Sequence, residues 1–329
     1  MATHDRKSCM AHLVLVAPPI PNAVASQITK EDEKAINVLR SSHFYMICGR
    51  SKARIVSCTP RDMHYLDVTI QLESGETSSG SLVIPYMHFY ESAPEDFRLK
   101  IKSNGYDIRI ICDETLVFAT TPDDILMRRG RRNTVVQGFD NYRELTTFDM
   151  LYVGIAKENQ DSFSRLVERG HKSRNDILAL EPQRTPGARV SEETYLLFFM
   201  VDPLILTTFG KDAEFDEDDL DFSVPYHRVV ADAEKAVINV FQPKYNREKY
   251  RSYPKGRDGL YKQGYTGYVY SIAEGFTFKT DFGDFKGARS SEDLLMSNDA
   301  DFIAVDGEDV KLCISGKDFS IPLDAPEET

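Results

Sequence analysis

The stretch Phe148-Asp149-Met150-Leu151-Tyr152-Val153-Gly154-Ile155-Ala156-Lys157 decides how this sequence is interpreted. Its apolar residues run into a glycine, as in a strand that ends in a turn. Ser162 to Arg169 follows, with its apolar residues on one side, as in an amphipathic helix. Arg165 belongs to that helix. We therefore predict a strand followed by a helix that carries an arginine.

Further elements follow in the same region. Gly170-His171-Lys172 precedes a second helical stretch around Ile177 to Leu180, and Tyr195 to Val201 has the composition of a buried strand. Val229 to Phe241 is predicted to be a helix that carries Glu234. The proline that follows ends this helix. The order is strand, arginine helix, strand, glutamate helix.

This order resembles the GIY-YIG nuclease superfamily. The family has a strand that ends in Tyr-Ile/Val-Gly, here Tyr152-Val153-Gly154, then an arginine helix and a His or Tyr, here Arg165 and His171. Its metal-binding glutamate has a context like E-x-x-L-I-x-x-x-x-P-x-Y-N, and Glu234 to Asn246 follows this pattern. The resemblance extends from Tyr142 to Asn246.

Two features depart from the family pattern. The Gly-Ile-Tyr triplet expected shortly before Tyr152 is replaced by Phe139-Asp140-Asn141-Tyr142, so Tyr142 is taken as its substitute. The link between the third strand and Glu234 is also longer than usual and contains an acidic run over 212–221. These departures indicate an elaborated member with a degenerate first motif.

The resemblance implies a metal-dependent endonuclease. Tyr152, Arg165, His171 and Tyr142 are then the catalytic candidates, and Glu234 would bind Mg²⁺ or Mn²⁺. Hydrolysis of a phosphodiester builds negative charge, which a divalent cation and a planar guanidinium can offset. The implied substrate is nucleic acid, most often DNA in this family, and restriction or defence against foreign DNA is a use that the analogy suggests.

The segment Pro243 to Lys262 combines seven basic and two acidic residues with interleaved tyrosines. Such a pattern suits a groove that follows phosphates, and it equally suits a solvated basic loop before a tyrosine-rich strand. Asn246 could cap or brace the site, and it could equally be a turn residue after the proline. The candidates for nucleic-acid binding are Lys172, Arg174, Lys244, Asn246, Arg247, Lys249, Arg251, Lys255 and Arg257.

The predicted fold class is α+β, in three parts. Residues 1–133 form a β-rich mixed domain with a helix over Lys30 to Arg40. Residues 134–280 form a small GIY-YIG-like α/β domain, a short antiparallel sheet flanked by helices, with 212–221 as an insertion. Residues 281–329 form an acidic extension with short strands over Phe302 to Val305 and Val310 to Ile314.

Charge and composition restrict the function. The chain has 329 residues, 40 Lys and Arg against 52 Asp and Glu, and a net charge of −12. This excludes indiscriminate coating of nucleic acid. The excess of acidic residues is concentrated in 212–221 and 281–329, so a local basic cleft elsewhere is possible. If one of these acidic segments occupied that cleft, it would restrain cleavage of the substrate. No apolar run is long enough for a membrane helix, and five scattered cysteines favour a reducing cytoplasm.

Two other interpretations stay open at this point. The degenerate first motif is compatible with a catalytically inactive module that acts as a nucleic-acid or protein binding platform. Each site residue also has an ordinary structural role, in which case the resemblance is accidental. The sequence leaves the oligomeric state open as well, and a homo-oligomer is compatible with it.

Overall fold

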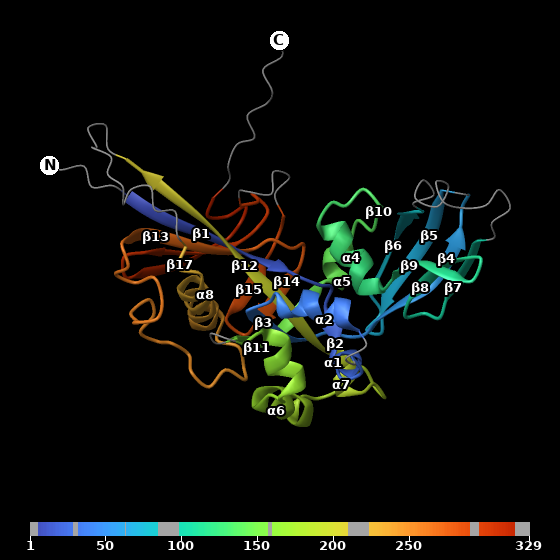
Figure 1. Ribbon diagram of the computed structural model, residues 1–329, viewed down its shortest axis with the longest axis horizontal. Helices are drawn as coiled ribbons and strands as arrows, with labels where there is room; N and C mark the ends of the chain where they lie inside the picture. The colour runs from blue at the N-terminus through green and yellow to red at the C-terminus, as the bar shows by residue number, and fades with distance from the viewer. Residues whose placement is uncertain are drawn as a thin grey trace, which may run out of the picture.

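The computed structural model describes residues 6–28, 32–62, 64–84, 99–156, 160–209, 224–289 and 296–319 (Figure 1). They form an α+β fold, as predicted. Two bodies of β-structure lie side by side, a large sheet and a group of small sheets (Figure 1). None of the helices in these ranges has the length and apolar character needed to cross a membrane.

The large sheet runs through the centre of the molecule. Among the described residues it has ten strands, and its main path is β15 (Gly283–Lys286), β14 (Thr277–Thr280), β11 (Thr147–Ile155), β3 (Phe44–Gly49), β12 (Thr194–Thr208), β1 (Arg6–Leu15), β13 (Tyr265–Ile272), β16 (Phe302–Asp306) and β17 (Asp309–Cys313). The tenth strand, β2 (Ile20–Pro21), pairs with β12. The strand β3 lies between β11 and β12 and is antiparallel to both.

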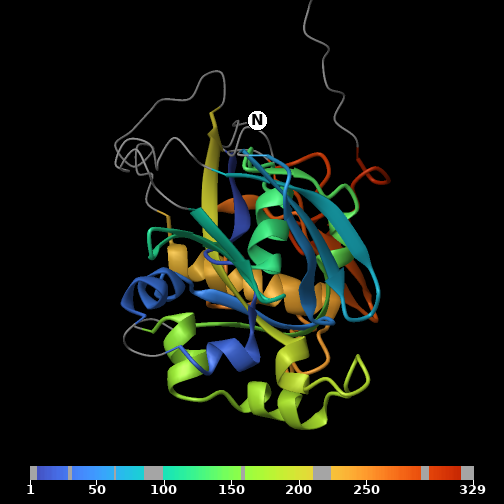
Figure 2. The same ribbon diagram turned by 90° about the vertical axis from the view of Figure 1, so that its right-hand side faces the viewer.

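Residues between β3 and β11 build the small sheets. One comprises β10 (Val136–Gly138), β6 (Thr77–Val83), β5 (Tyr65–Leu72) and β4 (Ala53–Pro60); the other comprises β7 (Leu99–Ser103), β8 (Ile108–Cys112) and β9 (Thr115–Thr120). The helices α4 (Pro122–Gly130) and α5 (Tyr142–Leu145) pack with them. Buried residues such as Leu66, Ile108 and Phe139 give this part its own core, which lies in front of the large sheet in Figure 2.

Helices cover both faces of the large sheet. Alternate residues of β3 point to opposite faces, so Phe44 and Met46 join one core and Tyr45 and Ile47 the other. The first core packs against α8 (Tyr226–Phe241). On the second side lie α1 (Asn22–Ala25), α2 (Glu33–Arg40), η1 (Ser164–Glu168), α6 (Lys172–Leu180) and α7 (Val190–Glu193).

The strand pairing crosses both predicted domain boundaries. From the predicted domain 1–133, β1 and β3 lie in the same sheet as β11 and β12. From the predicted extension 281–329, β15 to β17 join that sheet too, and β16 and β17 confirm the predicted strands in this region. A separate short sheet over 134–280 is therefore not observed, because β11 and β12 are strands of the large sheet and β3 lies between them. The acidic insertion 212–221 lies outside the described residues.

Candidate functional site

The site lies at a free sheet edge. On one side, β11 pairs with β3 along most of its length. On the other side, within the described part of the chain, β14 pairs only with Thr147, Phe148 and Asp149. The remaining half of β11 therefore presents backbone groups that need partners from outside the sheet.

The partners of this edge are the residues that the family pattern singles out. The amide N–H of Tyr245 donates to Leu151 O at 3.0 Å. The Asn246 side chain accepts from Val153 N at 2.9 Å and donates to Val153 O at 2.7 Å. Arg165 Nη1 donates to Ile155 O at 2.7 Å, and the backbone of Ile155 acts to lower the pKa of Glu234. Because alternate residues of a strand present their backbone groups to the same side, these contacts follow the edge in order.

Two tyrosines from neighbouring strands lie beside this edge. The ring centroids of Tyr45 on β3 and Tyr152 on β11 are 6.2 Å apart, and the rings are stacked. The pairing of β11 shifts by one residue between Met150 and Tyr152, and such a bulge re-aims the side chain that follows. Gly154 makes room for both rings: a Cβ there would lie 2.7 Å from Tyr45 Oη and 2.9 Å from a Tyr152 ring carbon.

His171 packs against both tyrosines. Its Nε2 lies 3.2 Å from Tyr45 Oη, and its Nδ1 accepts from the Arg174 N–H at 3.4 Å as the N-cap of α6. These contacts assign the ring proton to Nε2, which donates to Tyr45. Burial, and secondly the positive charges of Arg165 and Arg174, lower the pKa of His171 to about 4. The imidazole is therefore neutral at pH 7.

A pocket of about 850 Å³ opens where η1, α8 and the end of β11 meet. The residues of α8 that line it recur at helical spacing, so they form one face of the helix. Arg165 is presented by η1, a π-helical turn of a kind found frequently at functional sites. The main lining residues are Tyr152, Ile155, Arg165, His227, Arg228, Ala231, Glu234, Tyr250, Arg257 and Asp258.

Glu234 is the most perturbed carboxyl group of this pocket. Burial raises its pKa to about 7, although Arg165 and Lys235 act in the opposite direction. Burial also raises the pKa of Tyr152, and the Glu234 carboxylate adds to that rise. A half-buried, incompletely paired carboxylate that faces a pocket is a candidate for binding or catalysis, because its desolvation opposes stability.

The pocket contains few candidate metal ligands. Asp258 is held by Lys235 Nζ, which leaves Glu234 as the carboxylate that would hold a cation. Groups of three or more His, Cys, Asp or Glu able to hold a metal are absent from the described ranges. Mg²⁺ commonly uses one or two protein carboxylates and keeps several waters, so Glu234 and a water-accessible pocket fit Mg²⁺ better than a fully protein-ligated ion.

The structure brings together four of the five residues predicted for catalysis and metal binding. Tyr152, Arg165 and Glu234 line the pocket, and His171 contacts Tyr152. Tyr142 is not among them: it lies in α5, before β11 begins, and lines a different pocket. The tyrosine next to Tyr152 is Tyr45, whose strand partner is Gly154. Tyr45 belongs to the run Ser42-His43-Phe44-Tyr45, far upstream of Tyr152 in the sequence.

Two residues predicted to bind nucleic acid are structural. Arg174 is 8% exposed, and its guanidinium donates to Asn22 Oδ1, Leu166 O and Ser26 Oγ. Asn246 is 7% exposed, and both of its amide atoms are bound to Val153. Neither side chain is available to a phosphate. The burial argues against a phosphate-binding role for both side chains, whereas the alternative of a brace for Asn246 agrees with its bonds to Val153.

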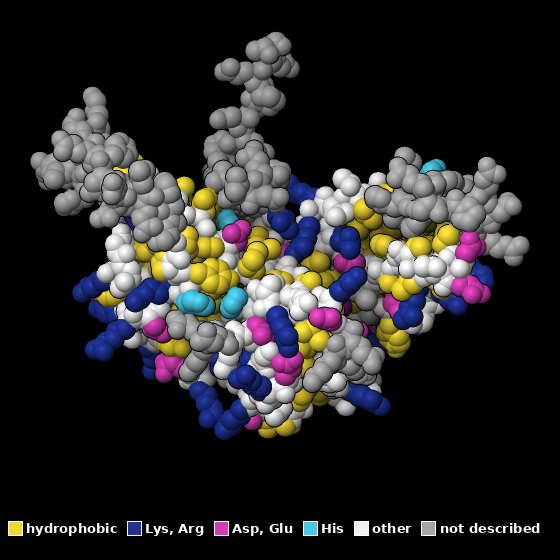
Figure 3. All heavy atoms as spheres, viewed as in Figure 1, with side chains coloured by type: hydrophobic (Ala, Val, Ile, Leu, Met, Phe, Trp, Pro, Cys, Tyr) yellow, Lys and Arg dark blue, Asp and Glu magenta, His cyan; other side chains and the backbone are white. Residues whose placement is uncertain are grey.

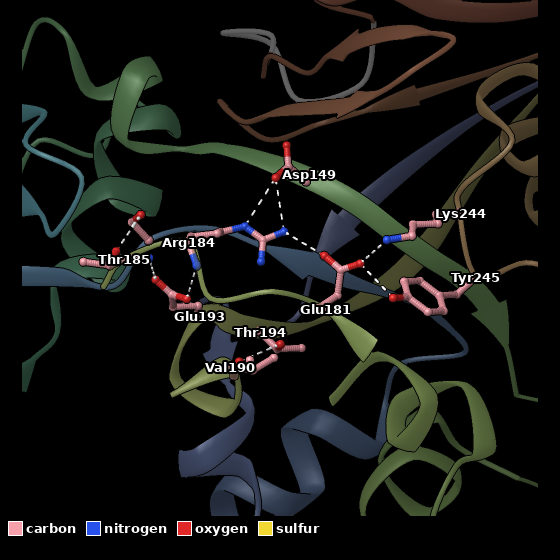
Figure 4. Close-up of polar contacts among 10 residues, drawn as sticks. Asp149, Glu181, Arg184, Thr185, Val190, Glu193, Thr194, Lys244 and Tyr245 are labelled. Atoms are coloured by element: carbon pink, nitrogen blue, oxygen red, sulfur yellow. Dashed lines mark hydrogen bonds and ion pairs between the residues drawn. The ribbon is translucent and has the colours of Figure 1, made fainter. Parts of the chain in front are cut away.

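Lys244 takes part in a polar network beside β11 (Figure 4). Glu181 accepts from Lys244 Nζ and from Tyr245 Oη, both at 2.7 Å, and contacts Arg184, which also binds Asp149. This network ties the loop after α6 to β11 and to the turn after α8. It therefore supports Tyr245 and Asn246 at the free edge.

The other predicted basic residues lie at the surface. Arg257 lines the pocket. Lys255 pairs with Glu308, Arg247 lies 3.8 Å from Asp176, and Lys249 Nζ donates to the carbonyls of Gln242 and Pro243. Lys172 and Arg251 are exposed. Of the residues predicted to bind nucleic acid, Arg257 is thus the one that lines the same pocket as Glu234.

Asn246→Ala is expected to destabilise the fold. The substitution leaves the N–H and C=O of Val153 without their partner, and a buried unsatisfied backbone group costs about 1–3 kcal/mol. We expect the free energy of unfolding, measured with urea, to fall by about 2–4 kcal/mol. The matched control is Arg247→Ala at the exposed next position, which should change it by less than about 0.5 kcal/mol. Equal effects of the two substitutions would contradict the bracing role.

Comparison with protein-family models, curated proteins and solved structures finds no match to this chain.

Proposed function

We propose that the protein is a metal-dependent endonuclease of the GIY-YIG type that hydrolyses phosphodiester bonds, with DNA as its substrate. The observation that carries this proposal is the convergence of Tyr152, Arg165 and Glu234 on one pocket, with His171 packed against Tyr152. These four residues come from separate segments and occur in the family's order. The antiparallel group β11-β3-β12, flanked by helices, also agrees with the sheet that the resemblance implies.

Arg165 and the nearby arginines are suited to hold a scissile phosphate. The guanidinium of Arg165 is fixed by Ile155 O through Nη1, so its other donors have a defined direction. Arg228 and Arg257 reach the same pocket, and Arg228 is fixed by the Arg257 carbonyl at 2.8 Å. A planar guanidinium can bind two phosphate oxygens and stabilise the charge that develops during hydrolysis.

Glu234 and Tyr152 would act on the attacking water and its proton. Glu234 would hold the cation, and a bound Mg²⁺ supplies Lewis-acid stabilisation of the phosphoryl group. Tyr152 lines the pocket, and its hydroxyl would orient the water. Its pKa is raised partly by the Glu234 carboxylate, so neutralising that carboxylate eases loss of the tyrosine proton.

Tyr45 and His171 are positioning residues in this proposal. Tyr45 is fully buried and so does not contact substrate. Its ring supports Tyr152, and its hydroxyl accepts from the neutral His171. The pair fixes the rotamer of Tyr152. A hydroxyl group that orients a reacting water must be held in such a fixed position.

Cleavage of supercoiled plasmid tests the proposal. The purified protein is expected to nick or linearise plasmid in the presence of Mg²⁺ or Mn²⁺ and to lose this activity in EDTA. Glu234→Ala serves as the matched inactive variant. An RNA substrate is assayed in parallel to test the choice of DNA. If wild type and Glu234→Ala show the same absence of cleavage on every substrate, the enzymatic proposal fails.

Metal binding separates the nuclease from an inactive platform. Wild type is expected to bind Mn²⁺, measured by electron paramagnetic resonance, and Glu234→Ala is expected to bind at least about tenfold more weakly. A wild-type protein that binds nucleic acid but neither binds Mn²⁺ nor cleaves would favour the binding platform.

A further inference from the structure

A second pocket, of about 380 Å³, lies where the part built between β3 and β11 meets the large sheet. The end of α4, the helix α5 and the turn after β15 form its walls. Figure 3 shows Lys and Arg side chains gathered along this junction. The charged residues that line the pocket are Arg129, Arg132, Arg143, Lys286, Arg289 and Asp299.

Close backbone packing builds this pocket. A Cβ on Gly275 would lie 2.6 Å from the Cα of Gly130 and 2.8 Å from Tyr142 Oη. The two glycines therefore let the end of α4 pack directly on the turn between β13 and β14. Side chains larger than glycine at either position would separate the cations of α4 and α5 from those that follow β15.

Two of the arginines at the pocket, Arg129 and Arg143, are anchored through one part of the guanidinium group. Arg129 Nε donates to Gly138 O, and Arg143 Nη1 donates to Gly287 O at 3.0 Å. Both guanidinium groups also lie beside the Tyr142 ring, 5.4 and 5.6 Å from its centroid. A guanidinium has five N–H donors, so each anchored group can still bind an anion from a fixed position.

The charge of the pocket is one-sided. Its described lining has five cationic side chains and one carboxylate, Asp299; outside the lining, Arg129 also lies 3.5 Å from the exposed Asp140. Asp299 lies 3.5 Å from Arg132, and the two side chains are 65% and 57% exposed, so this pair is weak. Like charges gathered in one cavity repel each other, and an anion with several negative oxygens relieves that repulsion.

We propose that this pocket binds a compact polyphosphate, such as the di- or triphosphate group of a nucleotide. The cations converge on one small volume from three segments, whereas a nucleic-acid duplex spreads its charge along an axis. The proposal does not rest on the nuclease assignment. The pocket lies near Thr147 at the start of β11. Glu234 lies beside Ile155 at the other end of this nine-residue strand, roughly 30 Å along the strand.

Binding of tripolyphosphate, followed by calorimetry and by thermal shift, tests this proposal. Wild type is expected to bind it and to melt at a higher temperature, because a ligand of the folded state stabilises that state. The double variant Arg132→Glu, Lys286→Glu is expected to bind at least tenfold more weakly. The matched control is Lys100→Glu, Lys102→Glu on the exposed strand β7, which changes the net charge equally and should bind within twofold of wild type.

Several outcomes overturn the proposal. The proposal is overturned if wild type does not bind tripolyphosphate. It is also overturned if the pocket variant and the control variant bind tripolyphosphate equally weakly, because that result would indicate a non-specific charge effect. A short DNA duplex that displaces tripolyphosphate from wild type, but binds the pocket variant at least tenfold more weakly, would reassign the pocket to the nucleic-acid backbone. If the double variant fails to fold by circular dichroism, Arg132→Ala decides, because its partner Asp299 is exposed. These readouts measure binding and are independent of cleavage.

Discussion

Replacing Glu234 with glutamine is expected to abolish cleavage and to make the protein more stable at pH 8. The amide has nearly the same shape as the carboxyl group, so the backbone of Ile155 keeps a polar neighbour. It lacks the negative charge that a divalent cation needs. Loss of this charge should lower the rate at least about a thousandfold, as the removal of a principal electrostatic stabiliser does.

The stability gain follows from the direction of the pKa shift. Burial raises the pKa of Glu234 to about 7, from an ordinary value of 4.5. Between pH 4.5 and pH 7 the unfolded chain has lost a proton that the folded chain keeps, so this group lowers stability as the pH rises through that window. The destabilisation is complete above pH 7. Glu234→Gln removes it, and we expect a gain of about 1–3 kcal/mol at pH 8 and little change at pH 4.

Urea denaturation of wild type and Glu234→Gln at the two pH values measures this difference. The exposed Glu144→Gln on α5 is the control, since it removes a carboxylate without the burial. A gain at pH 8 combined with lost activity would mark Glu234 as a site where function opposes stability. Equal stability of wild type and Glu234→Gln at pH 8 would show that the carboxyl group is well solvated or paired, contrary to its raised pKa.

The glutamate side of the site could be predicted because it is local in sequence. The spacing from Glu234 to Asn246 contains a helix, its end at Gln242 and the turn at Pro243, and the structure has all three. The segment of η1 was also found within two residues of its bounds, whereas α6 begins five residues before the predicted stretch and β12 ends seven residues after the predicted strand. Helical period, caps and buried apolar runs act over a few residues, so one sequence is enough to detect them.

Tyr45 could not be predicted in the same way. It reaches Gly154 through strand pairing, while about a hundred residues between β3 and β11 fold into sheets with a core of their own. The pairing partner of a strand depends on long-range hydrogen bonds, which leave no periodic trace in the sequence. The sequence pattern therefore pointed to Tyr142, the nearest tyrosine before β11, which lines the second pocket.

The fold of the site also explains why so many of its residues have two roles. The free edge of β11 needs donors and acceptors, and Arg165, Tyr245 and Asn246 supply them. Tyr245 and Asn246 lie along the edge as braces. Arg165 donates to Ile155, the last edge residue, and lines the pocket together with Glu234. Satisfying the sheet edge thus fixes the geometry of the groups proposed to act on the substrate.

Arg165→Ala is expected to lower the cleavage rate about a thousandfold, because a guanidinium that stabilises the transition state contributes at least that much in phosphoryl transfer. Arg165→Lys keeps a positive charge but loses the planar fork, so we expect a loss of about a hundredfold. The control is Arg169→Ala, an exposed arginine at the end of the same segment, which should stay within twofold of wild type.

The rates should be measured under single-turnover conditions with saturating plasmid, so that binding does not limit them. Loss of the bond from Arg165 Nη1 to Ile155 O also weakens the edge of β11, and thermal melting of each variant measures that effect separately. A catalytic role requires a fall in rate in protein that is still folded at the assay temperature. If Arg165→Lys cleaves as fast as wild type, or if all lost activity returns on cooling the variants below their melting transition, Arg165 braces β11 and does not bind the phosphate.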